Sequence, residues 1–248
     1  MTLTLENISL HLGQTEILKN ISTRFHPGQL NGLIGINGSG KSMLLKSILK
    51  LMPAKGSVSF NGLPLSPLDY SYIPQNSSIS ANFSVFEIIL LGLYQDLSWK
   101  ISEEEIQKVE EIAQLLHLED LATRSYRTLS GGQQQMVLLA QALVKAPKLI
   151  FADEPTSALD ISNQLEYMQC LQQYTQNHHC TTVIILHDLA LMSRFIDYFY
   201  VLKKGQLIAE GDRQKILCQK VLEDVYHVQL DISKTKNGYL SILPISNL

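Results

Sequence analysis

The sequence predicts an α/β fold with a mostly parallel core sheet, an antiparallel β-subdomain at its N-terminal end and a helical subdomain inserted in the middle. Three observations support this class. Short apolar segments alternate with helical segments in the second half of the chain, which is typical of parallel strands joined by crossovers. Residues 3–25 alternate with period two, and residues 101–121 follow the period of a helix.

The first third of the chain has mainly the pattern of strands. Period-two alternation and apolar β-branched residues predict a hairpin around Gly13, and Pro53 is expected to end the first helix. The expected strands are 3–12, 17–25, 29–35 and 70–74, a strand and turn are expected within 57–65, and the expected helix is 41–52.

The rest of the chain is expected to form helices first and then alternating strands and helices. The helix at 101–121 begins with a capping box made by Ser102 and Glu105. Asn237-Gly238 is a strong turn signal for a C-terminal hairpin. The further elements are strands at 148–152 and 181–186, helices near 160–176 and after 187, and hairpins at 198–211 and at 227–233 with 239–245.

We therefore expect one domain over residues 1–248. Its core would comprise residues 1–75 and 146–230, its helical subdomain residues 76–145, and its hairpin tail residues 231–248.

Composition narrows the function classes. The 248 residues are 45% hydrophobic and carry a net charge of −3, which is ordinary for a globular domain and argues against nucleic acid as the main partner. The three cysteines, Cys170, Cys180 and Cys218, fit no metal spacing and are expected to be free thiols. Residues 85–94 are the most apolar segment and are too short to span a bilayer, and no signal peptide is predicted, so a soluble protein is expected.

The segment GINGSGKS, residues 35–42, predicts a phosphate-binding turn. It matches G-x-x-x-x-G-K-[ST] after a predicted strand and before a predicted helix, which is the context that the motif requires. Backbone N–H groups would surround the phosphates, Lys41 would reach the β- and γ-phosphates, and Ser42 would ligate Mg²⁺. The alternative is a glycine-rich turn with an exposed lysine. The candidate nucleotide ligands are Asn37, Gly38, Ser39, Gly40, Lys41, Ser42 and Met43.

Polar residues follow three other predicted strands at the same edge of the sheet. Asp153 would hold Mg²⁺ through water, and Glu154 would polarise an attacking water as general base. Gln75 would touch both Mg²⁺ and this water, and His187 would donate to a γ-phosphate oxygen. Taken singly, each of the four also fits an ordinary loop residue. Together with a complete phosphate turn, they indicate catalysis.

The segment LSGGQ, residues 129–133, raises a question, because it is a second turn suited to an anion. Ser130, Gly131, Gly132 and Gln133 precede a strongly helical run, whose N-terminus would aim its positive end at a phosphate. If the two turns lie on opposite sides of a sheet, one chain cannot bring both to one nucleotide.

In their order and spacing, these motifs resemble the ATP-binding subunit of an ABC transporter over roughly residues 2–230. LSGGQ between the phosphate turn and ADEPTSALD (residues 152–160) is far more specific to that class than the phosphate turn itself. The resemblance implies the P-loop NTPase fold of ABC ATPases, ATP and Mg²⁺ as cofactors, and ATP hydrolysis.

The resemblance also implies that two copies of the chain enclose two ATP molecules. Each ATP would lie on one chain's phosphate turn and under the other chain's LSGGQ segment, and Asp160 matches the loop that links the two sites. Many relatives carry an aromatic residue that stacks on adenine where this chain has His11 and Leu12, so stacking is expected to be weak or to come from His11. Asn31 and Gln134 also depart from the common pattern.

Three segments, residues 82–94, 153–164 and 217–232, resemble those of ATPases from importers of the iron-chelate branch. That branch handles ferric siderophores, haem or cobalamin, with molybdate importers close by. The implied partners are integral membrane permease subunits and, indirectly, an extracytoplasmic substrate-binding protein. The implied location is the cytoplasmic face of the bacterial inner membrane. Phe83, Tyr94 and Trp99 are candidate permease contacts, although they fit the subdomain core equally well. The alternatives are a non-transport ABC ATPase, acting on ribosomes or DNA, and a regulator with little turnover.

Overall fold

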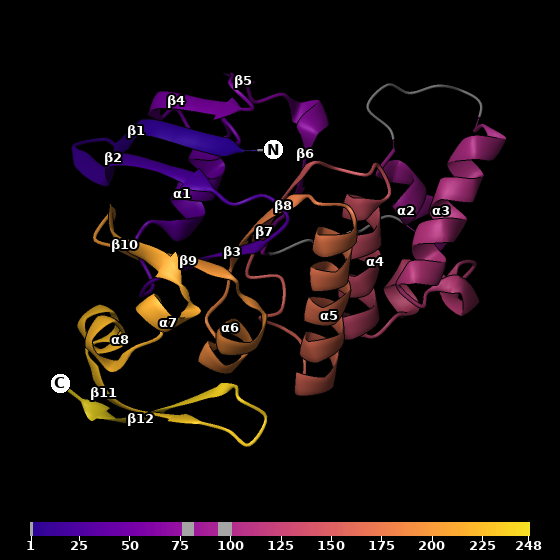
Figure 1. Ribbon diagram of the computed structural model, residues 1–248. Helices are drawn as coiled ribbons and strands as arrows, with labels where there is room; N and C mark the ends of the chain where they lie inside the picture. Colours follow the sequence, from indigo (N-terminus) through magenta and orange to yellow (C-terminus); the bar gives the residue numbers. More distant parts are fainter. Residues whose placement is uncertain (1, 76–81, 94–100) are drawn as a thin grey trace.

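An antiparallel sheet forms the N-terminal part of the molecule. The computed structural model describes residues 2–75, 82–93 and 101–248. In this sheet the strands lie in the order β2-β1-β4-β5 (Figure 1). Their bounds are Leu3–Leu12 for β1, Thr15–Phe25 for β2, Lys55–Phe60 for β4 and Leu63–Pro64 for β5. The predicted hairpin around Gly13 is confirmed, and this glycine has a φ of 60°.

The second sheet is the parallel core that the sequence predicts. Its order is β10-β9-β3-β8-β7-β6, and every neighbouring pair is parallel except β9 and β10. The bounds are Leu30–Ile34 for β3, Tyr70–Ile73 for β6, Leu149–Asp153 for β7, Thr181–Ile185 for β8, Tyr198–Lys203 for β9 and Gln206–Asp212 for β10. The β9–β10 hairpin is the one expected at 198–211.

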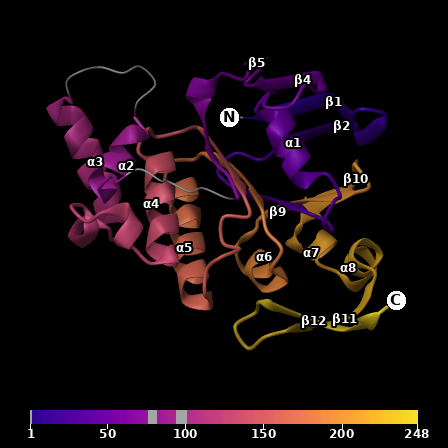
Figure 2. The same cartoon turned by 180° about the vertical axis from the view of Figure 1, so that it is seen from behind.

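Helices cover both faces of the core sheet. In Figures 1 and 2, α4 and α5 run side by side, and the core strands lie between them and α1. The bounds are Lys41–Ile48 for α1, Val85–Leu91 for α2, Glu103–Leu115 for α3, Gly131–Leu143 for α4, Ile161–Asn177 for α5, Leu189–Phe195 for α6, Arg213–Ile216 for α7 and Gln219–Tyr226 for α8.

Alternating strand residues divide the apolar core into two clusters. On β8, Val183 and Ile185 pack with α1 and the antiparallel sheet, whereas Ile184 packs with the helices on the other face. Both faces of the core strands are therefore buried, which explains why these strands read as short continuous apolar runs. The burial also fixes the register, since a one-residue slip would exchange the two faces.

Two predicted helices are shorter than expected. The helix expected at 41–52 ends at Ile48, because Lys50 is left-handed with a φ of 58°. The helix expected at 101–121 ends at Leu115, before His117 with a φ of 56°, although its capping box of Ser102 and Glu105 is confirmed. The strand and turn expected within 57–65 are confirmed: β4 ends at Phe60, and a turn at residues 61–62 leads into β5.

The C-terminal hairpin lies beside α6 and α8 at the end of the molecule away from β4 and β5 (Figure 2). Its strands are β11, Val228–Lys234, and β12, Leu240–Asn247. The hairpin is confirmed, but the connection is longer than two residues: Thr235 N–H donates to the Tyr239 carbonyl at 2.8 Å, and Gly238 has a φ of 80°.

Asn31 has a structural explanation that the sequence did not suggest. It lies fully buried in β3, where an apolar residue is usual. Its side-chain amide donates to the carbonyls of His26, Gln29 and Thr182 at 2.9, 3.0 and 3.1 Å, and its side-chain oxygen accepts from the His26 N–H at 2.9 Å. Asn31 therefore holds the connection between β2 and β3 against the sheet, and its buried polar atoms are satisfied.

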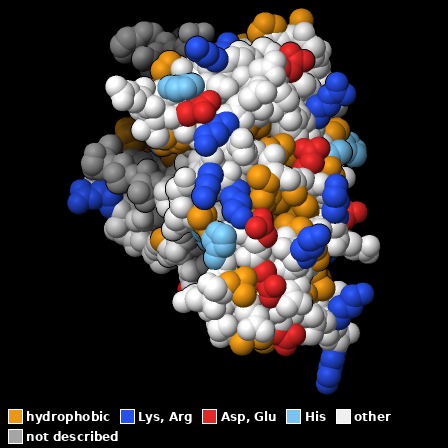
Figure 3. All heavy atoms as spheres, turned by 90° about the vertical axis from the view of Figure 1, so that its left-hand side faces the viewer, with side chains coloured by type: hydrophobic (Ala, Val, Ile, Leu, Met, Phe, Trp, Pro, Cys, Tyr) orange, Lys and Arg blue, Asp and Glu red, His pale blue; other side chains and the backbone are white. Residues whose placement is uncertain are grey.

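Within the described ranges, none of the helices is both long and apolar enough to cross a membrane. Figure 3 shows the face formed by the left-hand side of Figure 1, where lysine and arginine side chains are interspersed with aspartate and glutamate.

Candidate nucleotide-binding site

The predicted catalytic residues meet at one edge of the core sheet, where four parallel strands end. Strands β3, β6, β7 and β8 share this carboxyl edge through their parallel pairings. Ligands of open α/β sheets bind outside this edge. The edge carries the glycine-rich turn after β3, Gln75 after β6, Asp153 and Glu154 at the end of β7, and His187 after β8.

The glycine-rich turn at residues 35–42 is held in a conformation that only glycine adopts easily. Gly35 has a φ of 145°, and a Cβ there would lie 2.1 Å from the Leu202 carbonyl oxygen. Gly40 is left-handed, with a φ of 106°, and is the N-cap of α1. These conformations let the turn lead directly into the N-terminus of α1. The free backbone N–H groups at a helix N-terminus can bind a phosphate.

Lys41 lies inside this turn. Its Nζ donates to the carbonyls of Gly35 at 2.7 Å and Ile36 at 3.0 Å, and the residue is only 6% exposed. Burial lowers the pKa of its ammonium group, while the carboxylates of Glu154 and Asp153 act in the opposite direction. A phosphate would give this buried cation a charged acceptor in place of two carbonyl groups.

Ser42 and Asp153 form an oxygen pair beside the turn. The Ser42 hydroxyl donates to Asp153 Oδ1 at 2.9 Å, and Asp153 is 3% exposed. Burial raises the pKa of the Asp153 carboxyl group, and the neighbouring Glu154 raises it further. A hydroxyl and one carboxylate suit Mg²⁺, which binds few protein ligands together with substrate phosphates and waters. The described part of the chain contains no cluster of three or more His, Cys, Asp or Glu residues that could hold a metal ion.

Glu154 is the centre of a second hydrogen-bond network. Gln75 Nε2 donates to its Oε2 at 2.8 Å, and His187 Nε2 lies 2.5 Å from its Oε1. Glu154 itself has a φ of 51°, a backbone conformation that is uncommon outside glycine. Such conformations concentrate at functional sites, and the Glu154 carboxylate contacts both Gln75 and His187. The structure therefore brings together the three residues predicted to be catalytic.

A hollow of about 520 Å³ lies over the glycine-rich turn. It is lined by Leu12, Ile17, Asn37, Gly38, Gly40, Lys41, Ser42, Met43, Gln75 and Glu154. Most of the predicted nucleotide ligands therefore share one pocket with two of the predicted catalytic residues. Its size is within the range of small-molecule sites.

Two predicted ligands near the hollow, His11 and Ser39, do not line it. The Nε2 of His11 lies 3.9 Å from Glu16 Oε1 across the β1–β2 hairpin. Its neighbour Leu12 lines the hollow together with Ile17, because successive strand residues point to opposite faces. Period-two alternation along β1 was the sequence signal that could have identified Leu12. Ser39 is 2% exposed and does not line the hollow.

The LSGGQ segment is built differently from the glycine-rich turn. Ser130 is the N-cap of α4, where its hydroxyl accepts from Gln133 N–H at 3.3 Å and Gln133 Oε1 accepts from Ser130 N–H at 3.1 Å. None of the residues that line the hollow over the glycine-rich turn belongs to this segment. In Figures 1 and 2, α4 and α1 stand on opposite sides of the core strands.

Gln134 and Asp160 support the surroundings of this segment. Gln134 Nε2 donates to the carbonyls of Tyr126 at 3.2 Å and Leu129 at 3.3 Å, so it fastens the chain that leads into the segment. Asp160 is the N-cap of α5 and accepts from Asn163 N–H at 2.9 Å. Neither residue reaches the hollow over the glycine-rich turn.

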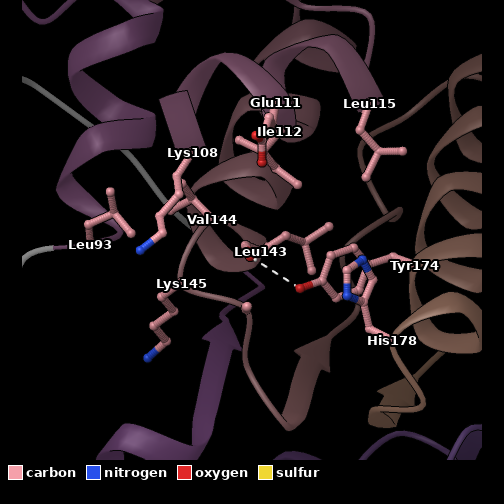
Figure 4. A pocket seen from close by; sticks show the side chains of 11 residues that line it. Leu93, Lys108, Glu111, Ile112, Leu115, Leu143, Val144, Lys145, Tyr174 and His178 are labelled. Carbon is pink, nitrogen blue, oxygen red and sulfur yellow. Dashed lines mark hydrogen bonds between the residues drawn. The ribbon is translucent and has the colours of Figure 1, made fainter. Parts of the chain in front are cut away.

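A second hollow of about 400 Å³ lies where α3 and the C-terminal ends of α4 and α5 meet (Figure 4). Tyr174 stacks on His178 with a centroid distance of 4.2 Å, and its hydroxyl donates to the Leu143 carbonyl at 3.2 Å. The predicted catalytic and nucleotide-binding residues are absent from its lining. The geometry therefore assigns phosphate chemistry to the first hollow.

Comparisons with known proteins agree with this assignment. A family model described as ABC transporter matches residues 18–157, more than half of the chain. The chain is 34% identical to the ABC transporter ATP-binding protein MJ0089 of Methanocaldococcus jannaschii, over 99% of this chain and 98% of that protein. It is 32% identical to the hemin import ATP-binding protein HmuV of Shewanella denitrificans, over 97% of this chain and 99% of that protein.

Solved structures give the same family. One described as an inward-facing conformation of a metal-chelate type ABC transporter matches with a TM-score of 0.87 and 26% identity, over 98% of this chain and 97% of that chain. The ADP conformation of the ATP-binding cassette MJ1267 matches with a TM-score of 0.81 and 28% identity, over 91% and 98% of the two chains. The fold, the assembled site and these similarities together show that the chain belongs to the ATP-binding subunits of ABC transporters, a family of ATPases.

Proposed function

We propose that this subunit hydrolyses ATP to energise the import of a metal chelate, a ferric siderophore or haem, through a partner permease. The observation that carries this proposal is the similarity, along almost the whole chain, to proteins named for hemin import. Similarity to the siderophore transport ATP-binding protein YusV of Bacillus subtilis also supports the proposal. The two chains are 30% identical over 92% of this chain. The proposed location is the cytoplasmic face of the membrane that holds the permease.

In the proposed cycle, two copies of the chain close head to tail on two ATP molecules. The LSGGQ segment, in which Ser130 and Gly131 are exposed, supports this arrangement, since it begins a helix but lies apart from its own chain's nucleotide hollow. Ser130, Gly131, Gly132 and Gln133 would cap the γ-phosphate on the second copy's glycine-rich turn. ATP-driven closure would move the permease, and hydrolysis would reopen the pair.

Each polar residue of the hollow has a role in this cycle. Lys41 would exchange its carbonyl partners for the β- and γ-phosphates. Ser42, Asp153 and Gln75 would hold Mg²⁺, whose contribution is to neutralise charge on the phosphates. Glu154 would take a proton from the attacking water, and His187 would stabilise the γ-phosphate. His187 and Gln75 both contact Glu154, which supports roles for the two side chains beside the proposed general base.

The permease is expected to contact the surface that follows Gln75. Phe83, with 36% of its surface exposed, lies just before α2 and is a candidate contact. Tyr94 and Trp99, the other two aromatic candidates, lie outside the described residues. An extracytoplasmic substrate-binding protein would act on the permease and only indirectly on this chain.

The shared site can be tested by mass in solution. We expect the full chain carrying Glu154→Gln to be a monomer without nucleotide and a dimer with Mg·ATP, because the change blocks hydrolysis and preserves binding. Adding Ser130→Asp to that chain should abolish the dimer without weakening ATP binding to the single chain. A dimer that tolerates Ser130→Asp, or that forms equally well without ATP, would contradict the shared site.

The cargo requires the complete transporter. ATP hydrolysis by the chain with its permease would be measured with binding proteins loaded with ferric siderophore, haem, cobalamin or molybdate. Stimulation by the first two supports the proposal, and the empty binding proteins serve as controls. Stimulation by cobalamin or molybdate alone would assign the same motor to another import branch. Stimulation by none would favour an ABC ATPase outside transport.

A further inference from the structure

The two glycines of the LSGGQ segment have different surroundings. A Cβ on Gly131 would meet nothing within 4 Å. A Cβ on Gly132 would lie 2.5 Å from Asn163 Cγ and 2.7 Å from both its Oδ1 and its Nδ2. Gly131 is therefore open to an approaching ligand. Gly132 must be a glycine because any larger residue would overlap the Asn163 side chain of the same chain. Asn163 belongs to the first turn of α5, the helix that runs beside α4 (Figure 1).

Asn163 is itself fixed by Asp160. Its backbone N–H donates to Asp160 Oδ1 at 2.9 Å, and its side-chain amide donates to Asp160 Oδ2 at 2.9 Å. One carboxylate thus orients both the backbone and the side chain of a single residue. Hydrogen bonds to an ionised acceptor are among the stronger ones in proteins, so the amide plane that faces Gly132 is held in one orientation.

The same helical turn also holds the loop that carries Glu154. Gln164 Nε2 donates to the Thr156 carbonyl at 3.1 Å, and Leu159 N–H donates to the same carbonyl at 3.2 Å. Ser157 N–H donates to the Glu154 carbonyl at 3.2 Å. A continuous set of contacts therefore runs from Glu154 through the start of α5 to Gly132.

We propose that Asn163 is a positioning residue that sets the LSGGQ segment relative to the loop of Glu154. The inference rests on the proposed function, in which that segment serves the second copy's ATP while Glu154 serves the chain's own ATP. Asn163 touches neither nucleotide hollow nor catalytic side chain, and it acts through Gly132 and Asp160. Its loss would weaken closure on ATP and leave ATP binding to the single chain unchanged.

The contact is tested first by thermal unfolding of the full chain. Gly132→Ala should lower the unfolding midpoint by about 5 °C, because the added methyl group overlaps the Asn163 amide. Asn163→Ala removes the three atoms that the methyl group would meet, so the double variant should unfold near the midpoint of Asn163→Ala alone. Gly131→Ala, the matched control, should not lower the midpoint. Additive losses in the double variant would overturn the contact.

The positioning role is tested by dimer formation in the Glu154→Gln background. Asn163→Ala should raise the Mg·ATP concentration that gives half-maximal dimer about tenfold, a change equivalent to about 1.4 kcal/mol. Binding of a fluorescent ATP analogue to the monomer should not change. Asn163→Asp retains the shape of the side chain but has no N–H donor for Asp160, so it should be at least as harmful as Asn163→Ala.

The outcomes separate this inference from the proposed function. Wild-type dimer formation by Asn163→Ala, or by Asn163→Asp, would overturn the positioning role. A Glu154→Gln parent that stays monomeric at saturating Mg·ATP would instead count against the shared site, while the unfolding midpoints would still decide whether Asn163 and Gly132 are in contact.

Discussion

The two turns that the sequence suits to an anion, residues 35–42 and residues 129–133, are built in opposite ways. The first uses glycines with positive φ, and Lys41 is buried inside it beside Ser42 and Asp153. The second has ordinary backbone geometry and a capping box, and it contributes no residue to the nucleotide hollow. One turn is thus surrounded by the predicted catalytic groups of its own chain, whereas the other, with Ser130 and Gly131 exposed, has none of them nearby. In the proposed cycle, a second copy of the chain completes the second turn.

The largest effect is expected at the centre of the first region. Glu154→Gln should lower ATP turnover by about 10²- to 10⁴-fold, the usual contribution of a general base. Phosphate release measured at saturating ATP would show it. Glu166→Gln, the same chemical change at an exposed position of α5, is the matched control and should leave turnover unchanged. Comparable turnover in the two variants would remove Glu154 as the base.

Lys41→Ala should weaken ATP binding to the single chain by about 10- to 100-fold, because it removes a charged donor to the phosphates. Titration with a fluorescent ATP analogue below the dimerising concentration would measure this. Under the same conditions Ser130→Ala should bind ATP as the unaltered chain does. Equal losses in both variants would contradict the division between an own-chain turn and a second-copy turn.

Two substitutions at Ser130 separate the helix cap from the phosphate contact. Ser130→Ala removes the cap of α4 and should cost about 1 kcal/mol, or about 2–4 °C in unfolding midpoint. Ser130→Asp retains a good N-cap residue, so its midpoint should stay close to that of the unaltered chain. Its added negative charge should nevertheless prevent ATP-driven dimerisation. A dimer formed by Ser130→Asp would show that no phosphate approaches this turn.

The smallest effect concerns stability and pH. The pKa of Asp153 is raised above that of the unfolded chain, so the native state binds a proton more readily and the free energy of unfolding falls as pH rises through that window. At neutral pH the buried charge therefore costs stability. Asp153→Asn should raise the unfolding midpoint without nucleotide by about 2–4 °C at pH 7, which corresponds to about 1 kcal/mol.

That gain should shrink as pH falls through the raised pKa of Asp153, because the carboxyl group of the unaltered chain then becomes neutral as well. Thermal unfolding of both proteins across the acidic range would measure it. A gain that grows toward low pH would show that burial does not set the pKa of this group.

Much of the fold follows from local patterns that one chain segment carries by itself. Alternation identified β1 and β2, the capping box located the start of α3, and short apolar runs identified the buried strands β7 and β8. Helix ends were less predictable. Lys50 and His117 adopt left-handed conformations, which are uncommon outside glycine, so no local pattern predicted where α1 and α3 end.

The sequence by itself determined which residues lie at the carboxyl edge of the core sheet, because parallel strands place whatever follows them at a shared edge. Lys41, Glu154 and His187 could therefore be named before any coordinates. Only the tertiary structure decided which neighbours they touch: Leu12 rather than His11 at the nucleotide hollow, and Asn163 against Gly132. The physical reason is that such contacts join segments far apart in the chain, and their fit depends on packing distances that no local pattern encodes.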